Sequence, residues 1–161
     1  MALAEAGWLR DTTRIVSSTE TKAVQTAEIL ASALRLGVEM RPEMHENDRS
    51  ATGFLPSTAF EATANQFFAD PTISVRGWER AVDAQARVLR EVEQVLSQHR
   101  SGDWLLVGHG AVGTLLYCHL AGLPISRNHD QPLGGGNYFT FIRDSRQILH
   151  PWRAMEEKPP F

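Results

Sequence analysis

The sequence has a single cysteine and little net charge. Cys118 is the only cysteine among 161 residues, which excludes an intrachain disulfide and a cysteine-rich zinc module. The formal net charge is -3, so no global basic field attracts nucleic acid or an anionic membrane surface. We therefore expect neither as a partner, and any anion site has to be local. The cysteine usage also fits a reducing compartment, so we expect a cytoplasmic protein.

Long apolar runs are missing as well. No stretch approaches the roughly 18 to 20 apolar residues of a membrane span, and no basic segment precedes an apolar one at the N-terminus. We expect a soluble protein that is not exported. The chain also lacks repeats, low-complexity tracts and linkers, so residues 1–161 are expected to form a single domain.

Short β-branched stretches alternate with segments of helical periodicity. Strands are expected at 14–18, 38–40, 104–109, 138–144 and 147–152, and helices at 19–36, 57–69, 77–99 and 111–122. This alternation predicts an α/β fold of three layers, α/β/α, with a mostly parallel sheet in the middle. Residues 1–8, MALAEAGW, look like the end of a helix whose beginning is missing.

Ligands in such folds bind beyond the carboxyl ends of the strands, and two of these ends are chemically distinctive. The first is WLLVGHGAVG, residues 104–113, which places a histidine between two glycines where a strand gives way to a helix. Free backbone N–H groups at this junction suit an anion, Gly108 and Gly110 allow close approach, and protonated His109 adds a charged donor. A turn histidine satisfied by the backbone explains the motif equally well.

The second end is SSTETKA, residues 17–23, which we expect to face the same crevice. Ser17, Ser18 or Thr19 can simply cap the following helix, which is the commoner role of hydroxyls at this place. Lys22, about one turn into the helix, could reach a phosphate at the helix start, although most such lysines are solvated. By itself this segment is best explained as a capping turn.

The long polar loop 41–57 contains HENDRS, residues 45–50. Glu46 could serve as a general acid or base if it is partly desolvated, and His45 or Asp48 could bind a metal. A solvated polar loop explains the same residues, and their spacing is not that of a firm metal site. We expect no metal and no cofactor; a metal-dependent hydrolase that uses these residues with His109 is the weaker alternative.

Three motifs together, RIVSSTETKAVQTAEILA, the loop with Glu46 and WLLVGHGAVGTLL, resemble the histidine phosphatase superfamily, which has the phosphoglycerate mutase-like fold. The similarity runs from about Arg14 to Tyr138. In that family a phosphohistidine forms on the histidine of an Arg-His-Gly motif at the end of the first strand, without a metal. The resemblance implies that His109 is the second histidine, which holds the phosphoryl group, and that Glu46 is the proton donor.

The residues expected to bind phosphate are Ser18, Lys22, Gly110 and Asn137. Lys22 stands where the family usually has its second arginine, and a lysine holds phosphate less rigidly than a planar guanidinium does. The larger departure is that Arg-His-Gly occurs nowhere in the chain. We therefore expect a domain without its first strand and without the family's nucleophile. Two unpaired sheet edges would remain, to be filled by a partner chain, a rearranged sheet or further residues.

Two hypotheses about function follow from the resemblance. The first is a phosphatase-like domain that acts on phosphomonoesters or phosphohistidine through a phosphohistidine mechanism in the complete protein. The second is a non-catalytic relative that binds phosphate or a partner through the remaining half of the site. The expected partner is a phosphorylated small molecule or a phosphoprotein, and the sheet edges favour a homo-oligomer. The substrate stays open, because specificity in such folds comes from variable loops, here 43–78.

Overall fold

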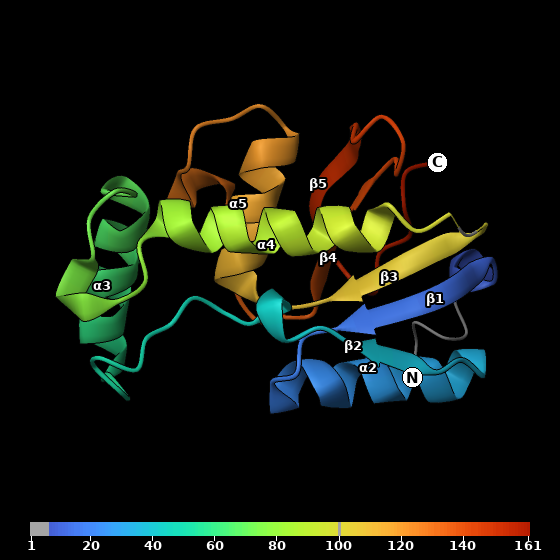
Figure 1. Ribbon diagram of the computed structural model, residues 1–161, viewed down its shortest axis with the longest axis horizontal. Coiled ribbons are helices and arrows are strands. Elements are labelled where there is room, and N and C mark those ends of the chain that lie inside the picture. The colour runs from blue at the N-terminus through green and yellow to red at the C-terminus, as the bar shows by residue number, and fades with distance from the viewer. Residues whose placement is uncertain (1–6, 100) are drawn as a thin grey trace.

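The computed structural model describes residues 7–99 and 101–161 (Figure 1). Residues 1–6 of the expected N-terminal helix lie outside the described residues. A short 3-10 helix begins at Gly7. In chain order the elements are η1 (Gly7–Leu9), β1 (Thr12–Ser17), α2 (Thr21–Leu34), β2 (Val38–Met40), η2 (Pro42–Met44), α3 (Ser57–Ala69), η3 (Val75–Gly77), α4 (Ala81–Leu96), β3 (Asp103–Val107), α5 (Gly110–Leu120), η4 (Arg127–His129), β4 (Asn137–Phe141) and β5 (Ile148–Ala154). No helix in this described part is long and apolar enough to cross a membrane.

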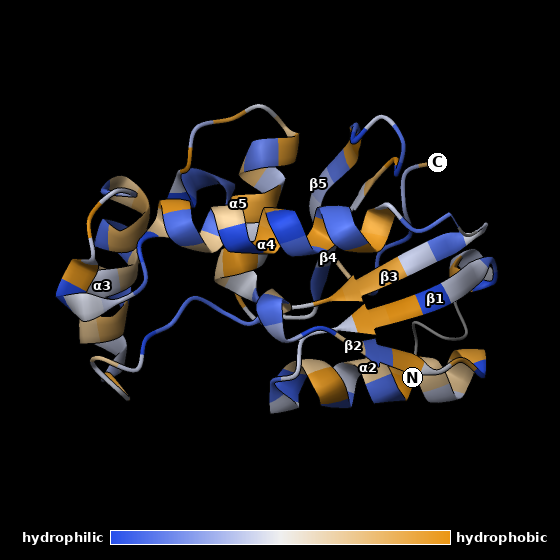
Figure 2. Ribbon diagram, viewed as in Figure 1, coloured by the Kyte–Doolittle hydropathy of each residue, from blue (hydrophilic) through white to orange (hydrophobic). Residues whose placement is uncertain are grey.

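The first three strands form a parallel sheet in the order β2-β1-β3. Side chains alternate between the two faces of a strand, and β1 shows this directly. Ile15 lies in a cluster with Ala27 and Leu30 of α2, whereas Val16 lies in a second cluster with Val95 of α4. Helix α2 therefore covers one face and α4 the other, and Figure 2 shows hydrophobic residues along β1 and β3 between them. The expected α/β fold with a parallel sheet is confirmed.

The largest hydrophobic cluster lies on the α4 side of the molecule. It joins Phe67 of α3, Val88 of α4 and Leu115 of α5 around Trp78, each at most 3% exposed. Helix α4 begins at Ala81, later than the expected residue 77. Arg76 and Gly77 have φ angles of 52° and 81°, which no right-handed helix contains, and Trp78 and Arg80 are extended. This cluster fixes α5, and with it the turn that carries His109.

The last two strands, expected at 138–144 and 147–152, do not join the parallel sheet. β4 and β5 pair with each other in a separate antiparallel sheet of two strands. Their pairing is antiparallel because the connection between Phe141 and Ile148 is short, whereas parallel strands need a crossover of about a dozen residues or more. A connection of this length fits a hairpin of the two strands.

Strand β3 of the parallel sheet and strand β4 of the hairpin each have one unpaired edge among the described residues. Within the described residues, β3 pairs only with β1, and β4 pairs only with β5. All five residues of β4 are half-buried, as are the four that follow Asp103 in β3, whereas Ile15 and Val16 of β1 are at most 1% exposed. Side chains link the sheets where Arg143 lies over the Trp104 ring, at 4.7 Å.

Candidate active site at the strand ends

His109 lies at the junction between β3 and α5, where the chain is still extended and α5 begins at the next residue. Its Nε2 atom is 2.9 Å from Oγ of Ser18 and 2.6 Å from Oε2 of Glu20. The structure thus places the two strand ends side by side at one crevice. A carboxylate can only accept a hydrogen bond, so the contact with Glu20 puts the ring proton on Nε2. The His109 side chain is 12% exposed, so it is largely desolvated but can be reached.

Ser18 is fully buried at the end of β1. Its hydroxyl oxygen accepts the backbone N–H of Glu20 at 3.2 Å, which is the local turn that hydroxyl residues favour before a helix. Its own N–H donates to the carbonyl of Val107 at 3.0 Å and so extends the pairing of β1 with β3. Ser18 therefore combines the capping turn that the sequence suggests with a direct contact to His109.

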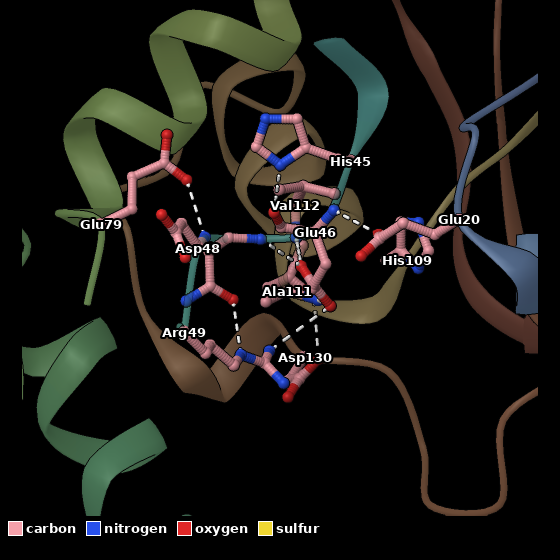
Figure 3. A network of polar contacts seen from close by, with 12 residues as sticks. Glu20, His45, Glu46, Asp48, Arg49, Glu79, His109, Ala111, Val112 and Asp130 are labelled. Atoms are coloured by element: carbon pink, nitrogen blue, oxygen red, sulfur yellow. Dashed lines mark hydrogen bonds and ion pairs between the residues drawn. The ribbon is translucent and has the colours of Figure 1, made fainter. Parts of the chain in front are cut away.

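Glu46 closes the crevice from the loop after η2. Its carboxylate accepts the backbone N–H groups of Ala111 and Val112 at 3.1 and 3.0 Å, in the first turn of α5 (Figure 3). A carboxylate at a helix N-terminus is stabilised by the unpaired N–H groups and the helix dipole. Two of the α5 N–H groups that we expected to be free for an anion are thus already bound by Glu46. Its side chain is 17% exposed, and Arg49 lies 3.4 Å from the same carboxylate.

Glu20 is a residue of this site that sequence reasoning missed. It precedes the first turn of α2 in an extended conformation. Besides the contact with His109, its Oε2 accepts the backbone N–H of Glu46 at 2.8 Å. One carboxylate therefore connects all three segments that form the crevice. The available signal was an acidic residue two positions after Ser18, at the same strand end.

Arg87 of α4 is the second missed residue, and it holds the loop that carries Glu46. Its guanidinium donates to the carbonyl oxygens of Glu43 at 2.7 Å, His45 at 3.0 Å and Glu46 at 3.4 Å. It also pairs with the carboxylate of Glu79 at 2.8 Å. Burial alone would raise the pKa of Glu79, but the Arg87 hydrogen bonds, the N–H of Asp48 and the Arg87 charge hold that pKa below its ordinary value.

An open cleft of about 520 Å³ lies beside this network. Its lining consists of Glu20, Gly53 and residues 45–50, the HENDRS segment. His45 turns its Nδ1 towards the carbonyl of Glu46, at 2.6 Å. The described residues contain no group of three His, Cys, Asp or Glu side chains placed to hold a metal ion. The metal-dependent alternative therefore gains no support from the geometry.

The remaining predicted residues make no hydrogen bond or ion pair with His109 or Glu46 among the described interactions. Lys22 is exposed on α2, and no hydrogen bond or ion pair of its ammonium group is present among the described residues. Asn137, at the start of β4, donates from its amide to Oε1 of Gln131 at 3.1 Å and to the carbonyl of Pro132 at 2.9 Å. Gln131 in turn covers Gly110, where a Cβ would overlap its amide nitrogen. Gly110 thus accommodates a side chain of the protein itself, while Gly108 faces open space.

Comparisons with known proteins agree with this architecture. The family model of the histidine phosphatase superfamily (branch 1) matches residues 1–150. A mycobacterial glucosyl-3-phosphoglycerate phosphatase in complex with inorganic phosphate superimposes with a TM-score of 0.73 at 22% identity, over 98% of this chain and 84% of its own. Bacillus stearothermophilus YhfR superimposes with a TM-score of 0.69 at 20% identity, over 93% of this chain and 77% of its own. The Shigella flexneri alpha-ribazole phosphatase superimposes with a TM-score of 0.62 at 18% identity, over 97% of this chain and 80% of its own. These likenesses show a shared fold. A search of curated proteins found no match.

Proposed function

Because the chain belongs to the histidine phosphatase superfamily, branch 1, we propose that the crevice at His109 receives the phosphoryl group of a phosphomonoester or a phosphohistidine. The observation that carries the proposal is the position of His109 Nε2, a proton donor aimed at an anionic oxygen where the ends of β1 and β3 meet. Solved relatives named as phosphatases of glucosyl-3-phosphoglycerate and alpha-ribazole support a phosphate ester as the ligand class.

Each residue has a distinct role in this proposal. His109 donates from Nε2 to a phosphoryl oxygen, and Ser18 Oγ lies 2.9 Å from the same nitrogen at the end of β1. Lys22 is free to turn towards the bound phosphate as a point charge, because α2 begins at the same crevice. Glu46, whose carboxylate caps the first turn of α5 directly after His109, is assigned the role of proton donor to a leaving group. Gly108 leaves space for the ligand, while Asn137 supports Gly110 through Gln131.

The nucleophile of the family has no counterpart in this sequence, which contains no Arg-His-Gly. The proposal therefore assigns the phosphohistidine step to a histidine contributed from outside these residues, on a strand of the same protein, of a second copy or of another chain. The half-buried apolar side chains of β3 and β4, each paired on one side only among the described residues, support a position for that strand.

The alternative function is phosphate or partner binding without turnover. It is favoured by the missing motif and by the capping role of Glu46, which serves the structure even without catalysis. The cytoplasmic location and the single-domain organisation predicted from the sequence apply to both functions.

Turnover of p-nitrophenyl phosphate separates the two functions. It is measured for this chain alone and for the chain joined to an N-terminal strand that carries Arg-His-Gly, with a matched version in which Ala replaces the added histidine. We expect no turnover by the chain alone and turnover only when the added histidine is present. Turnover that is independent of this histidine would contradict the phosphohistidine mechanism, and binding without turnover in every version would favour the non-catalytic function.

A further inference from the structure

Two hydrogen-bond donors converge on a single oxygen of Glu20 (Figure 3). Oε2 lies 2.6 Å from Nε2 of His109 and accepts the backbone N–H of Glu46 at 2.8 Å. One donor belongs to the turn between β3 and α5, and the other to the loop after η2. Donors fixed by two separate elements form a ready site for an anionic oxygen, and Glu20 is the group that fills it.

The two carboxylates of the crevice are held to different degrees. Glu46 is 17% exposed and uses both oxygens to accept N–H groups of α5. The Glu20 side chain is 47% exposed, and among the described residues every polar contact of its carboxylate is made through Oε2. Rotation of the Glu20 side chain into solvent breaks only these contacts, whereas removal of Glu46 leaves the start of α5 without its cap. Glu20 is therefore the carboxylate that can leave.

Resting on the phosphate site proposed above, we infer that Glu20 occupies the position of a phosphoryl oxygen and that a phosphorylated ligand binds by exchange with its carboxylate. Two anionic oxygens cannot share these donors, because they repel each other and compete for the one proton on Nε2. A phosphoryl group carries a charge of about -1.5 to -2 at neutral pH, which makes it a stronger acceptor than a monoanion. Glu20 thus determines specificity by keeping weakly held monoanions out of the site.

The test is calorimetric titration of the intact chain with inorganic phosphate, in a buffer of uncharged or cationic components. The variant Glu20→Gln keeps the size of the side chain but removes the competing charge. We expect its affinity for phosphate to rise roughly tenfold or more, as the loss of one charged hydrogen bond implies. The control is Glu28→Gln, an exposed change within α2, the helix that Glu20 precedes, with the same effect on net charge, and it should bind as the original chain does.

Four outcomes separate this inference from the function on which it rests. If His109→Ala binds phosphate as well as the original chain, the phosphate site at His109 is wrong and the inference falls with it. If binding requires His109 but Glu20→Gln binds equally or more weakly, only the competing role of Glu20 is wrong. A gain of the same size in Glu28→Gln would reduce the effect to net charge and would also overturn that role. No phosphate binding by any variant would overturn both.

A direct measurement keeps the inference testable if Glu20→Gln changes the stability of the chain. The ¹⁵N NMR signals of the His109 ring report the contact with Glu20 without any ligand. In Glu20→Gln and in the shorter Glu20→Asp these signals should shift, while those of His150, whose Nε2 lies 2.8 Å from Thr140 Oγ1, should not. An unchanged His109 signal in both variants would show that the contact does not exist.

Discussion

Arg87 and Glu79 form an ion pair of 2.8 Å beneath the loop that carries Glu46. The Arg87 side chain is 8% exposed and that of Glu79 18%, so the pair is screened from water far better than a surface ion pair. Because the same guanidinium donates to three carbonyl oxygens of the loop, it connects α4 rigidly to the crevice. The position of Glu46 is therefore set by a residue about forty positions away in the sequence.

Replacement of Arg87 should destabilise the fold strongly. Arg87→Ala leaves the Glu79 carboxylate and the loop carbonyls without their partner, and the loss of one member of a buried pair typically lowers the free energy of unfolding by about 3 kcal/mol. Urea denaturation followed by circular dichroism measures this value. Arg80→Ala, which removes a half-exposed ion pair with Asp83 at the start of the same helix, is the control and should change little. Equal unfolding midpoints for the two variants would contradict the clamp.

Stability should fall in acid partly through Glu79. Its pKa is lowered in the folded state, so its contribution is fully present above the unfolded pKa of about 4.5 and is lost as the pH falls through the folded value. The free energy of unfolding, measured in urea from neutral pH down to about pH 3, should therefore decrease less steeply for Glu79→Gln than for the original chain. Parallel curves below pH 4.5 would show that Glu79 gains nothing from Arg87.

Glu46→Ala should loosen the first turn of α5. The N–H groups of Ala111 and Val112 lose their acceptor, and loss of a helix cap lowers the free energy of unfolding by about 1 kcal/mol. Hydrogen exchange measured by NMR should show faster exchange at these two amides, with little change at the carboxyl end of α5. Glu43→Ala serves as control because that side chain is exposed in η2. Unchanged protection of both amides would disprove the capping contact.

The open edges of β3 and β4 predict a gradient of hydrogen exchange. Amides of β1 should exchange most slowly, because this strand is paired on both sides, and those of β3 and β4 should exchange faster. If a second copy covers these edges, protection at β3 and β4 should rise with protein concentration, in step with the sedimentation coefficient. Equal protection of β1 and β3 in a monomer would contradict open edges, and protection independent of concentration would contradict self-association.

Much of the fold is visible in local sequence patterns, and the reasons for the failures are physical. The strand at 38–40 and the helix at 57–69 occur with the expected bounds, because hydrophobic spacing and nearby turn residues act locally. The start of α4 was misplaced, since the left-handed conformation of Arg76 is not visible in its residue type. The antiparallel pairing of β4 and β5 fits the short connection between them, whereas the alternation of strands and helices predicted only a mostly parallel sheet.

The candidate site was only partly predictable for a similar reason. The meeting of Ser18 with His109 follows from parallel topology, which brings strand ends to one edge of a sheet. Glu20 was missed because its partners lie in other segments, and an isolated acidic residue has no periodic signature. Arg87 was harder to find because it is a charged residue at a buried position of α4, beside Val88. Its partners are carbonyl oxygens of a distant loop, which the sequence does not reveal.

The most direct test of the central claim is the NMR response of the His109 ring to inorganic phosphate. The account predicts that the ¹⁵N signals of His109 shift and saturate as phosphate is added, while those of His150, engaged with Thr140, stay unchanged. The same titration of His109→Ala should show no saturable binding. A His109 signal that is unaffected by phosphate at saturating concentration, or identical binding by His109→Ala, would contradict a phosphate site at this crevice.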